Sequence, residues 1–235
     1  MKTHAWQRTV GALLFIPLLC LSLLHYGIDV KFIMSFIVYL CIATTITSGY
    51  HRYFSHKSYE CNKFWQFLYG LIGTASLNSS PVEWASVHVT HHVHSDTSAD
   101  PYNSTWRQFF KFSDRNNIRA PKFLLRLLKD DIHRFWIKHS STVAFITAAI
   151  LLSISRDLFL FAYVLPVCAY LFTSYLHNIL AHKNHNPRNL PILEFIIPMC
   201  GEWMHKHHHE NPRLNLFSHF DFGGYFIWVI RNDKR

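Results

Sequence analysis

Four long apolar runs divide the chain, and most polar residues lie between the second and third runs or after the fourth. The runs cover residues 9–27, 32–50, 136–154 and 158–178. Each is close to the ~20 residues with which a helix crosses the hydrocarbon core of a bilayer. The links at 25–31 and 155–157 are short, so neighbouring runs should pair as antiparallel hairpins. The pattern predicts an all-α integral membrane protein with four transmembrane helices in a single domain, residues 1–235.

Two of these assignments have alternatives. The first run follows basic residues and could be a secretory signal peptide, but no small-residue cleavage site follows and a second run comes directly after. The last two runs could form one long kinked helix, but the charged pair Arg156-Asp157 between them favours two spans. A further apolar run at 64–77 is short for a span and predicts an interfacial or partly embedded helix.

Residues 121–136 place apolar side chains at intervals of three and four, with basic residues between them. The apolar positions are Phe123, Leu124, Leu127, Leu128, Ile132 and Phe135. This pattern predicts a basic amphipathic helix on the membrane surface. A helix packed in the core is the alternative. The polar stretch 102–120 and the proline-containing stretch 187–198 are predicted to be surface connections.

Composition agrees with a membrane protein, since 50% of the 235 residues are hydrophobic and only 16% are charged. The formal net charge is +9, yet no nucleic-acid-binding motif accompanies it. Anionic lipid headgroups or an acidic protein partner explain that charge more simply. Five cysteines without a C-x-x-C motif predict free thiols and no disulfide framework.

Charge also predicts orientation. With four spans, the links at 25–31 and 155–157 share one side of the membrane, and all other polar segments share the opposite side. Of the 23 Lys and Arg residues, only Lys31 and Arg156 fall on the first side. The positive-inside rule therefore predicts a multi-pass protein with both termini cytoplasmic. Residues 51–135 and 179–235 would form a helical cap on the cytosolic side.

Histidines recur at fixed spacings in this cap. They form two H-x-x-H-H triplets, His88/His91/His92 and His205/His208/His209, with the pair His51/His56 upstream. Spacings of three and four place each triplet on one face of a helix. Neutral imidazole is a ligand for iron, zinc and copper. A tract of surface histidines is the simplest alternative, and a structural zinc site another. Four ligands complete a zinc site, and about twice that number indicates two metal ions.

The pair His51 and His56 poses a geometric problem. Their separation of five residues corresponds to about 140° around a regular helix, so the two side chains would diverge. If both bind one metal, the helix is expected to bend or end between them.

With their flanking residues, these motifs resemble the membrane fatty-acid desaturase family, which contains the stearoyl-CoA desaturases and bacterial acyl-lipid desaturases. The family has H-x4-H, two H-x-x-H-H boxes and an N-x3-H element, which match Asn178/His182 and the histidines above in order and spacing. Ser-Gly-Tyr-His-Arg opens the first box, His-Ser-Asp-Thr-Ser-Ala-Asp-Pro follows the second, and Gly201-Glu202 precedes the third. The resemblance covers roughly residues 45–212.

The resemblance implies four long helices capped by a cytosolic domain that holds two iron ions. Carried over residue by residue, one iron would take His51, His56, His88, His92 and His209. The other would take His91, His182, His205 and His208, with Asn178 acting through water. His177 and His207 lack a motif position and are expected close to the site.

The chain departs from the family pattern at three places. Val89 stands where the family often has Arg, and Lys206-His207 replaces the usual Asn after the first histidine of the third box. Ser86-Val87 replaces the Arg-Asp that precedes the second box in animal acyl-CoA enzymes. This last difference weakens the case for acyl-CoA and favours a bacterial-type member.

The resemblance implies an oxygen-dependent desaturase that introduces a cis double bond, near carbon 9, into a long-chain acyl-lipid, acyl-CoA or acyl-ACP. Removing hydrogens from methylene groups needs a strong oxidant, which iron can form from O2 and electrons, whereas zinc has no redox chemistry. The sequence has no flavin, haem or nicotinamide motif. Electrons would therefore come from a donor such as ferredoxin or a b5-type cytochrome, attracted by the basic cytoplasmic face.

Two other functions stay open. A related membrane di-iron hydroxylase would use the same metals and yield an alcohol in place of an alkene. A metal transporter or metal store would need charged or histidine residues along its spans. Residues 9–24, 32–50 and 158–176 contain none, which disfavours transport.

One residue of the second run is a candidate for selecting acyl-chain length. Tyr39 lies twelve residues before His51, about 18 Å along a helix, which suits the distal half of a long acyl chain. The alternative is that Tyr39 faces lipid or packs against the first span.

Overall fold

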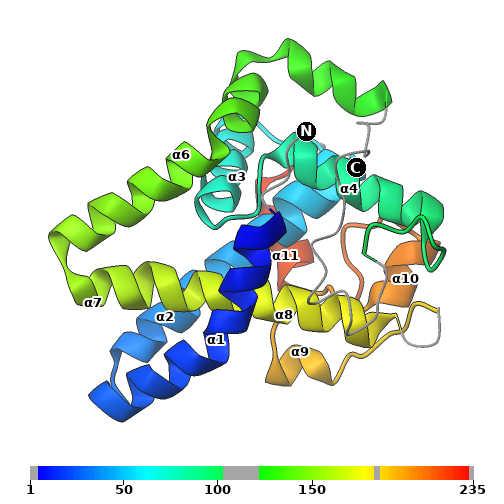
Figure 1. Cartoon of the computed structure of the whole chain (residues 1–235). Coiled ribbons are helices and arrows are strands. Elements are labelled where there is room, and N and C mark those ends of the chain that lie inside the picture. Colours follow the sequence, from blue (N-terminus) through cyan, green and yellow to red (C-terminus); the bar gives the residue numbers. More distant parts are fainter. Residues whose placement is uncertain (1–4, 103–121, 183–185, 233–235) are drawn as a thin grey trace.

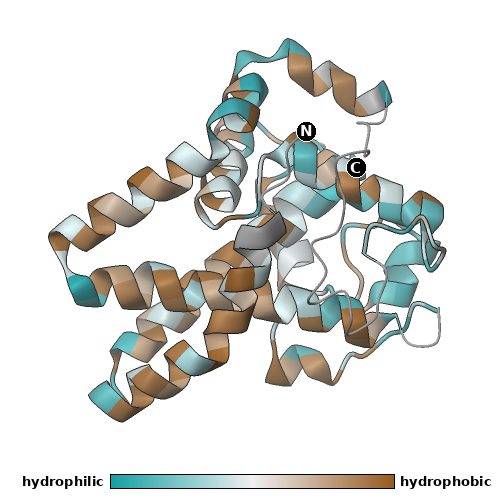
Figure 2. Cartoon of the chain, viewed as in Figure 1, coloured by the Kyte–Doolittle hydropathy of each residue, from teal (hydrophilic) through white to brown (hydrophobic). Residues whose placement is uncertain are grey.

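The computed structural model describes residues 5–102, 122–182 and 186–232, and the regular structure of these residues is helical, apart from isolated bridges. Four helical stretches there are long and apolar enough to cross a membrane, as the sequence predicts. They are Thr9–Tyr26, Lys31–Ser55, Asp131–Ile154 and Arg156–Ala181. Figure 2 shows apolar residues along these helices and polar residues around α10 (His205–Glu210).

The first hairpin joins α1 (Ala5–Tyr26) to α2 (Lys31–Thr44), two helices that pack mainly on α8 and little on each other, and α2 continues without interruption into the π-helical segment η1 (Thr45–Ser55). The second pairs α6 (Asp131–Ile154) with a long helix made of α7 (Arg156–Phe159), η4 (Leu160–Val164) and α8 (Leu165–Ala181). α8 packs against both α1 and α2, whereas α6 diverges from α8 and packs against α3 (Figure 1).

The second hairpin turns at Ser155, whose extended backbone (φ −164°, ψ 139°) interrupts the helix. Its hydroxyl accepts from the N–H groups of Asp157 and Leu158 and caps the next helix. Two separate helices are thus confirmed over one kinked helix. Asp157 ties the two turns together, because it accepts from Tyr26 Oη at 2.9 Å and pairs with Lys31 Nζ at 2.7 Å.

The short run at 64–77 forms α3 (Lys63–Ala75), which has 13 residues and is too short to cross a bilayer. It lies tightly against η1, since a Cβ on Gly73 would overlap the Tyr50 ring and a Cβ on Gly49 would overlap the Tyr69 ring. Glycine at both positions therefore allows the close approach. The interfacial position of α3 stays a prediction.

The single amphipathic helix predicted over 121–136 is wrong. A 3₁₀ segment, η3, occupies Lys122–Lys129, and α6 begins separately at Asp131. The reason is Asp130, whose carboxylate caps α6 by accepting from the Ile132 N–H and also contacts Lys63 Nζ at 2.6 Å. The third span therefore starts five residues earlier than residue 136.

Of the two predicted surface connections, the structure describes only the second. The stretch at 102–120 lies outside the described residues, except for Tyr102. The stretch at 187–198 contains a short helix, α9 (Leu193–Ile196), and is followed by α10 and α11 (Phe222–Ile230).

Candidate metal centre

The nine motif histidines gather at the end of the spans opposite the two hairpin turns. They come from η1, α4 (Pro81–His94), the end of α8 and α10. The start of α4 is fixed locally by a capping box, in which the Glu83 N–H donates to Ser80 Oγ and the Ser80 N–H donates to the Glu83 carboxylate. Pro81 follows at the first helical position, where its missing N–H costs nothing.

The π winding of η1 brings His51 and His56 together. The His56 N–H donates to the His51 carbonyl, an i→i+5 bond of 3.3 Å, so residues five apart lie on the same side of the helix. Their ring centroids are 5.1 Å apart. The helix ends at Ser55, with His56 as its C-cap, so the expected end between the two residues is confirmed; the wider π winding before that end adds to the effect.

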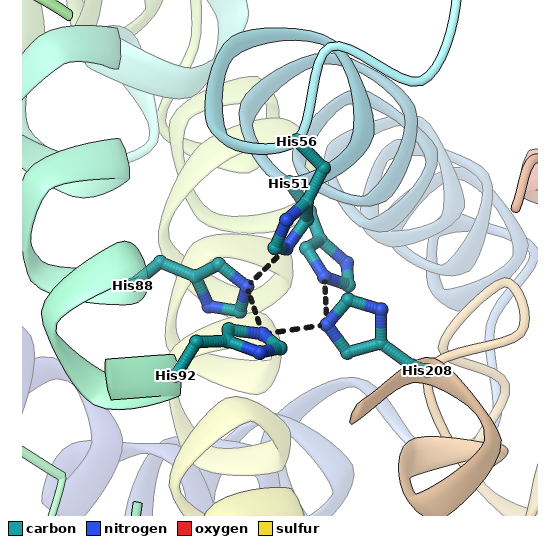
Figure 3. Close-up of side chains that lie close together, drawn as sticks. All are labelled: His51, His56, His88, His92 and His208. Carbon is teal, nitrogen blue, oxygen red and sulfur yellow. Dashed lines mark hydrogen bonds between the residues drawn. The ribbon is translucent and has the colours of Figure 1, made fainter. Parts of the chain in front are cut away.

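The first histidine group contains five members, drawn in Figure 3: His51, His56, His88, His92 and His208. Nε2 of His208 lies 2.8 Å from Nε2 of both His51 and His92, and Nε2 of His88 lies 2.9 Å from that of His56. Ligands at right angles around a metal with bonds of about 2.1 Å are themselves about 3 Å apart. The spacing and the uniform nitrogen donors therefore fit one metal ion.

The second group contains His91, His182, His205 and His209. Nε2 of His205 lies 2.6 Å from Nε2 of His182 and 3.0 Å from that of His209. In each group one nitrogen per residue lies within 4.8 Å of the others. Two adjacent metal ions would thus be accommodated, one per group.

This grouping corrects the split that the family resemblance implies, because His208 and His209 exchange places. Residues four apart are separated by about 40° around a helix and residues three apart by about 60°. Accordingly, α4 sends His88 and His92 to the first group and His91 to the second. α10 does the reverse and sends His205 and His209 to the second group and His208 to the first.

Three carboxylates hold the outer nitrogens of the histidines. Nδ1 of His51 lies 2.7 Å from Glu202, Nδ1 of His91 lies 2.9 Å from Asp100, and Nδ1 of His182 lies 3.2 Å from Asp96. A proton on Nδ1 leaves the Nε2 lone pair free to bind metal, and such partners orient the ring. In the sequence these acids stand out only as flanking residues of the motifs, and their signal is their position beside each box.

Burial keeps the imidazoles neutral. It lowers the pKa of His56 to about 2, with the neighbouring His51 adding to the effect, and lowers that of His209 to about 3. Burial alone would raise the pKa of Glu202, but the facing His51 and the nearby Arg52 hold it at about 2. The centre therefore combines neutral ligands with a charged carboxylate behind them, as a cation site requires.

A cavity opens beside the histidines, lined by Asn178, Trp84 and Tyr102 next to the two groups and by Tyr170 and Met199 farther along. Asn178 is half-buried on α8, one turn before His182, and its action through water stays a prediction. Both expected neighbours lie close, as His177 donates from Nε2 to the Glu202 carbonyl at 2.8 Å and His207 Nδ1 lies 3.3 Å from the Phe217 carbonyl.

No model of a known protein family matches the chain. It is 30% identical over 100 residues to the sn-1 stearoyl-lipid 9-desaturase of Anabaena variabilis, covering 40% of this chain and 37% of that protein. It is 28% identical over 210 residues to acyl-CoA desaturase 1 of Saccharomyces cerevisiae, covering 77% and 39%. It is 28% identical over 205 residues to the Delta(9)-fatty-acid desaturase fat-6 of Caenorhabditis elegans, covering 77% and 60%. The chain thus spans less than two thirds of each relative.

Proposed function

We propose that the chain is a member of the membrane fatty-acid desaturase family, to whose named members it is similar, and that it is an oxidoreductase that desaturates long-chain fatty-acyl substrates in an O2-dependent reaction. The observation that carries the proposal is the pair of adjacent histidine groups beside a cavity that extends between the spans. The relatives are named as 9-desaturases, and a cis double bond near carbon 9 is part of the proposal. The acyl carrier, a lipid, CoA or ACP, is left open.

The nine histidines would hold two iron ions, five ligands on one and four on the other. Bound iron would supply the oxidising power that hydrogen removal from a methylene pair demands. The chain's own groups do the rest. Glu202 and Asp100 orient His51 and His91, and of these two carboxylates Asp100 is buried.

The acyl chain would lie in the cavity with its methyl end directed toward Tyr39. That side chain is buried, and its hydroxyl donates to the Pro198 carbonyl at 2.8 Å, so Tyr39 neither faces lipid nor packs only against the first span. Tyr170 lines the cavity beside the histidines, and Tyr39 lines a second, apolar cavity between α1, α2 and α8; with ring centroids 6.5 Å apart, the two side chains would form the partition between these cavities. Tyr39 is therefore placed to limit the length of the acyl chain.

Electrons would reach the metals from an acidic protein donor on the cytoplasmic side. Exposed cations surround the outer edge of the histidine groups. Lys57 follows His56, Arg188 donates its N–H to Ala181 beside His182, and Arg213 is close enough to His56 to lower its pKa. His56, His92 and His209 are the less buried ligands on this side. Charge complementarity favours docking of an acidic partner there.

The decisive experiment is expression in a host that lacks its own desaturase, followed by mapping of double bonds in its lipids. New alkenes near carbon 9 support the proposal, whereas alcohols would indicate a hydroxylase and no product with iron bound would indicate metal storage. Protein purified without a histidine tag should contain about two irons per chain, because nine histidines exceed the needs of one metal. His91→Ala should abolish activity, and His25→Ala, at an exposed position outside every motif, should retain it.

A further inference from the structure

Two short helices that are not among the four candidate spans carry large apolar side chains on their open surfaces. On α11, Phe222, Trp228 and Val229 are 61%, 70% and 73% exposed. At α9, Ile192, Phe195 and Ile196 are 68%, 64% and 68% exposed. Contiguous apolar surface of this kind marks a protein or membrane contact. Both helices would belong to a cap in water if only the four spans entered the bilayer.

The packing of α11 against α2 gives its depth. Lys31 marks the start of α2, and a hydrocarbon core of about 30 Å takes up ~20 residues, to about residue 50. Phe226 of α11 lines an apolar groove with Ile37, Cys41 and Thr44 of α2. At ~1.5 Å per residue these positions lie about 9 to 20 Å from Lys31, well inside the core. The middle of α11 therefore lies beside a part of α2 that the length count places in hydrocarbon.

The same measurement applies to the other flank of α2. Ile196 and Pro198, at the end of α9, line a second apolar cavity with Phe36 and Tyr39. Those two residues lie about 8 to 12 Å from Lys31 along the helix. The Tyr39 hydroxyl contacts the Pro198 carbonyl directly. Pro198 therefore lies within the length of one tyrosine side chain of the Tyr39 backbone, at a similar depth.

Backbone polar groups of the α9 segment are hydrogen-bonded within the protein. This suits an apolar environment, in which an unpaired polar group would be costly. The Ile197 N–H donates to Leu193, and its carbonyl accepts from Trp203 Nε1 at 2.7 Å. The Pro198 carbonyl accepts from Tyr39. The Met199 N–H donates to the carboxyl of Glu194, which is turned inward and only 7% exposed.

The start of α11 is satisfied in a similar way. The Gly223 carbonyl accepts from Ser48 Oγ at 3.2 Å, and the Gly224 N–H donates to Asp221. Asp221 is itself fully buried and paired with the buried Arg52 of η1 at 3.0 Å. The charges that anchor α11 are thus neutralised inside the protein, while its apolar side chains point outward.

We propose that α9 and α11 are inserted into the bilayer on two flanks of α2 without crossing it, and that their exposed side chains contact lipid acyl chains. The lipid-facing residues are Ile192, Phe195, Ile196, Phe222, Trp228 and Val229. The lipid surface is the occupant because both helices continue the open apolar face of α2 itself, where Ile33, Phe36 and Ile37 are also exposed. The cap is then partly embedded, and the inference does not depend on the enzymatic function.

The test is depth-dependent quenching of a fluorophore in phosphatidylcholine nanodiscs. The exposed Cys20 and Cys41 are replaced by Ala, and a single cysteine is introduced by Phe195→Cys or Trp228→Cys and labelled with an environment-sensitive dye. The parent without an introduced cysteine corrects for labelling of the buried thiols. Phe36→Cys on α2 is the control for lipid contact, and Lys206→Cys on α10 is the control for water contact, since both positions are exposed.

We expect brominated acyl chains to quench the label at 195 and 228 about as strongly as at 36, and iodide in the water to quench only the label at 206. Quenching by iodide without quenching by bromolipid at 195 and 228 would overturn the proposal. Protection from both quenchers would also overturn it, since it would indicate a protein partner or a second copy. Ile192→Cys and Val229→Cys repeat the measurement if either first variant loses its helical circular dichroism.

Discussion

The imidazole rings of His92 and His209 are stacked, with centroids 4.3 Å apart and planes at 21°, although the two residues belong to different histidine groups. The contact joins α4 to α10 at the boundary between the two groups. It follows from the reciprocal pattern in which each helix contributes an i, i+4 pair to one group and its remaining histidine to the other. The two metals would therefore share their supporting helices, and neither metal site could form unless both α4 and α10 were in place.

This grouping predicts the outcome of double substitutions. His92→Ala/His208→Ala removes two ligands from the first group and none from the second, so about one metal per chain should be retained. His92→Ala/His209→Ala removes one ligand from each group and should leave less metal. Metal analysis of both proteins, at matched iron supply, distinguishes between the two assignments of His208 and His209. The opposite ranking would restore the assignment implied by the family resemblance.

Glu202 should control metal affinity through His51. Glu202→Ala removes the acceptor from Nδ1 of His51 and from Thr47 Oγ1, which lies 2.7 Å from the carboxylate. Loss of such a partner typically lowers metal affinity or activity about 10- to 100-fold. Competition with a chelator measures the change. Glu202→Gln keeps an acceptor oxygen and should lose less, and the exposed Glu210→Ala should match the parent.

The metal-free protein should be destabilised by mild acid. Burial holds the pKa of His56 at about 2 and that of His209 at about 3, whereas a histidine in the unfolded chain has a pKa of about 6.5. Below pH ~6.5 the unfolded state therefore binds more protons than the folded state, so stability is full above that pH and falls as the pH drops toward the folded-state values. Melting temperatures between pH 7.5 and 5 measure this. A constant or rising melting temperature would contradict it, and His56→Ala/His209→Ala should show a weaker dependence.

Tyr39→Ala should shift the product profile toward longer acyl chains, because it opens the partition between the two cavities. Fatty-acid analysis in the desaturase-deficient host gives the profile. Ile33→Ala on the same helix is the matched control, since that side chain is 59% exposed and lies away from the cavity. An unchanged profile at comparable activity would place Tyr39 away from the acyl chain.

Reversal of charge near the first group should weaken donor docking. Lys57→Glu/Arg213→Glu should raise the KM for an acidic protein donor several-fold, since each exposed ion pair contributes about 0 to 1 kcal/mol. The salt dependence of the rate should fall as well. Turnover driven by a small chemical reductant should stay unchanged. Arg156→Glu, at the opposite end of the spans, is the control. Equal effects with both reductants would locate the defect in the metal centre.

The sequence by itself determined the four candidate spans and the pool of candidate ligands. An apolar run of about 20 residues indicates a membrane span, because the hydrocarbon thickness sets that length. Histidines at spacings of three and four report a shared helix face for the same local reason. The apolar pattern over 121–136 does not reveal the boundary between η3 and α6 at Asp130, because a capping carboxylate can interrupt a periodic pattern that looks continuous.

Only the tertiary structure decided which histidines face one another and how deeply the short helices lie. Local spacing fixes the face of α10 but not the side from which α4 meets it, so His208 and His209 could be assigned only by packing. The π winding at His51 lies in η1, which packs against α3, α4 and α11, and the sequence does not reveal these contacts. The apolar residues of α9 and α11 are too few to predict insertion by length. Their depth follows from contacts with α2. Tyr39 and Pro198, which form one of these contacts, are more than 150 residues apart in the sequence.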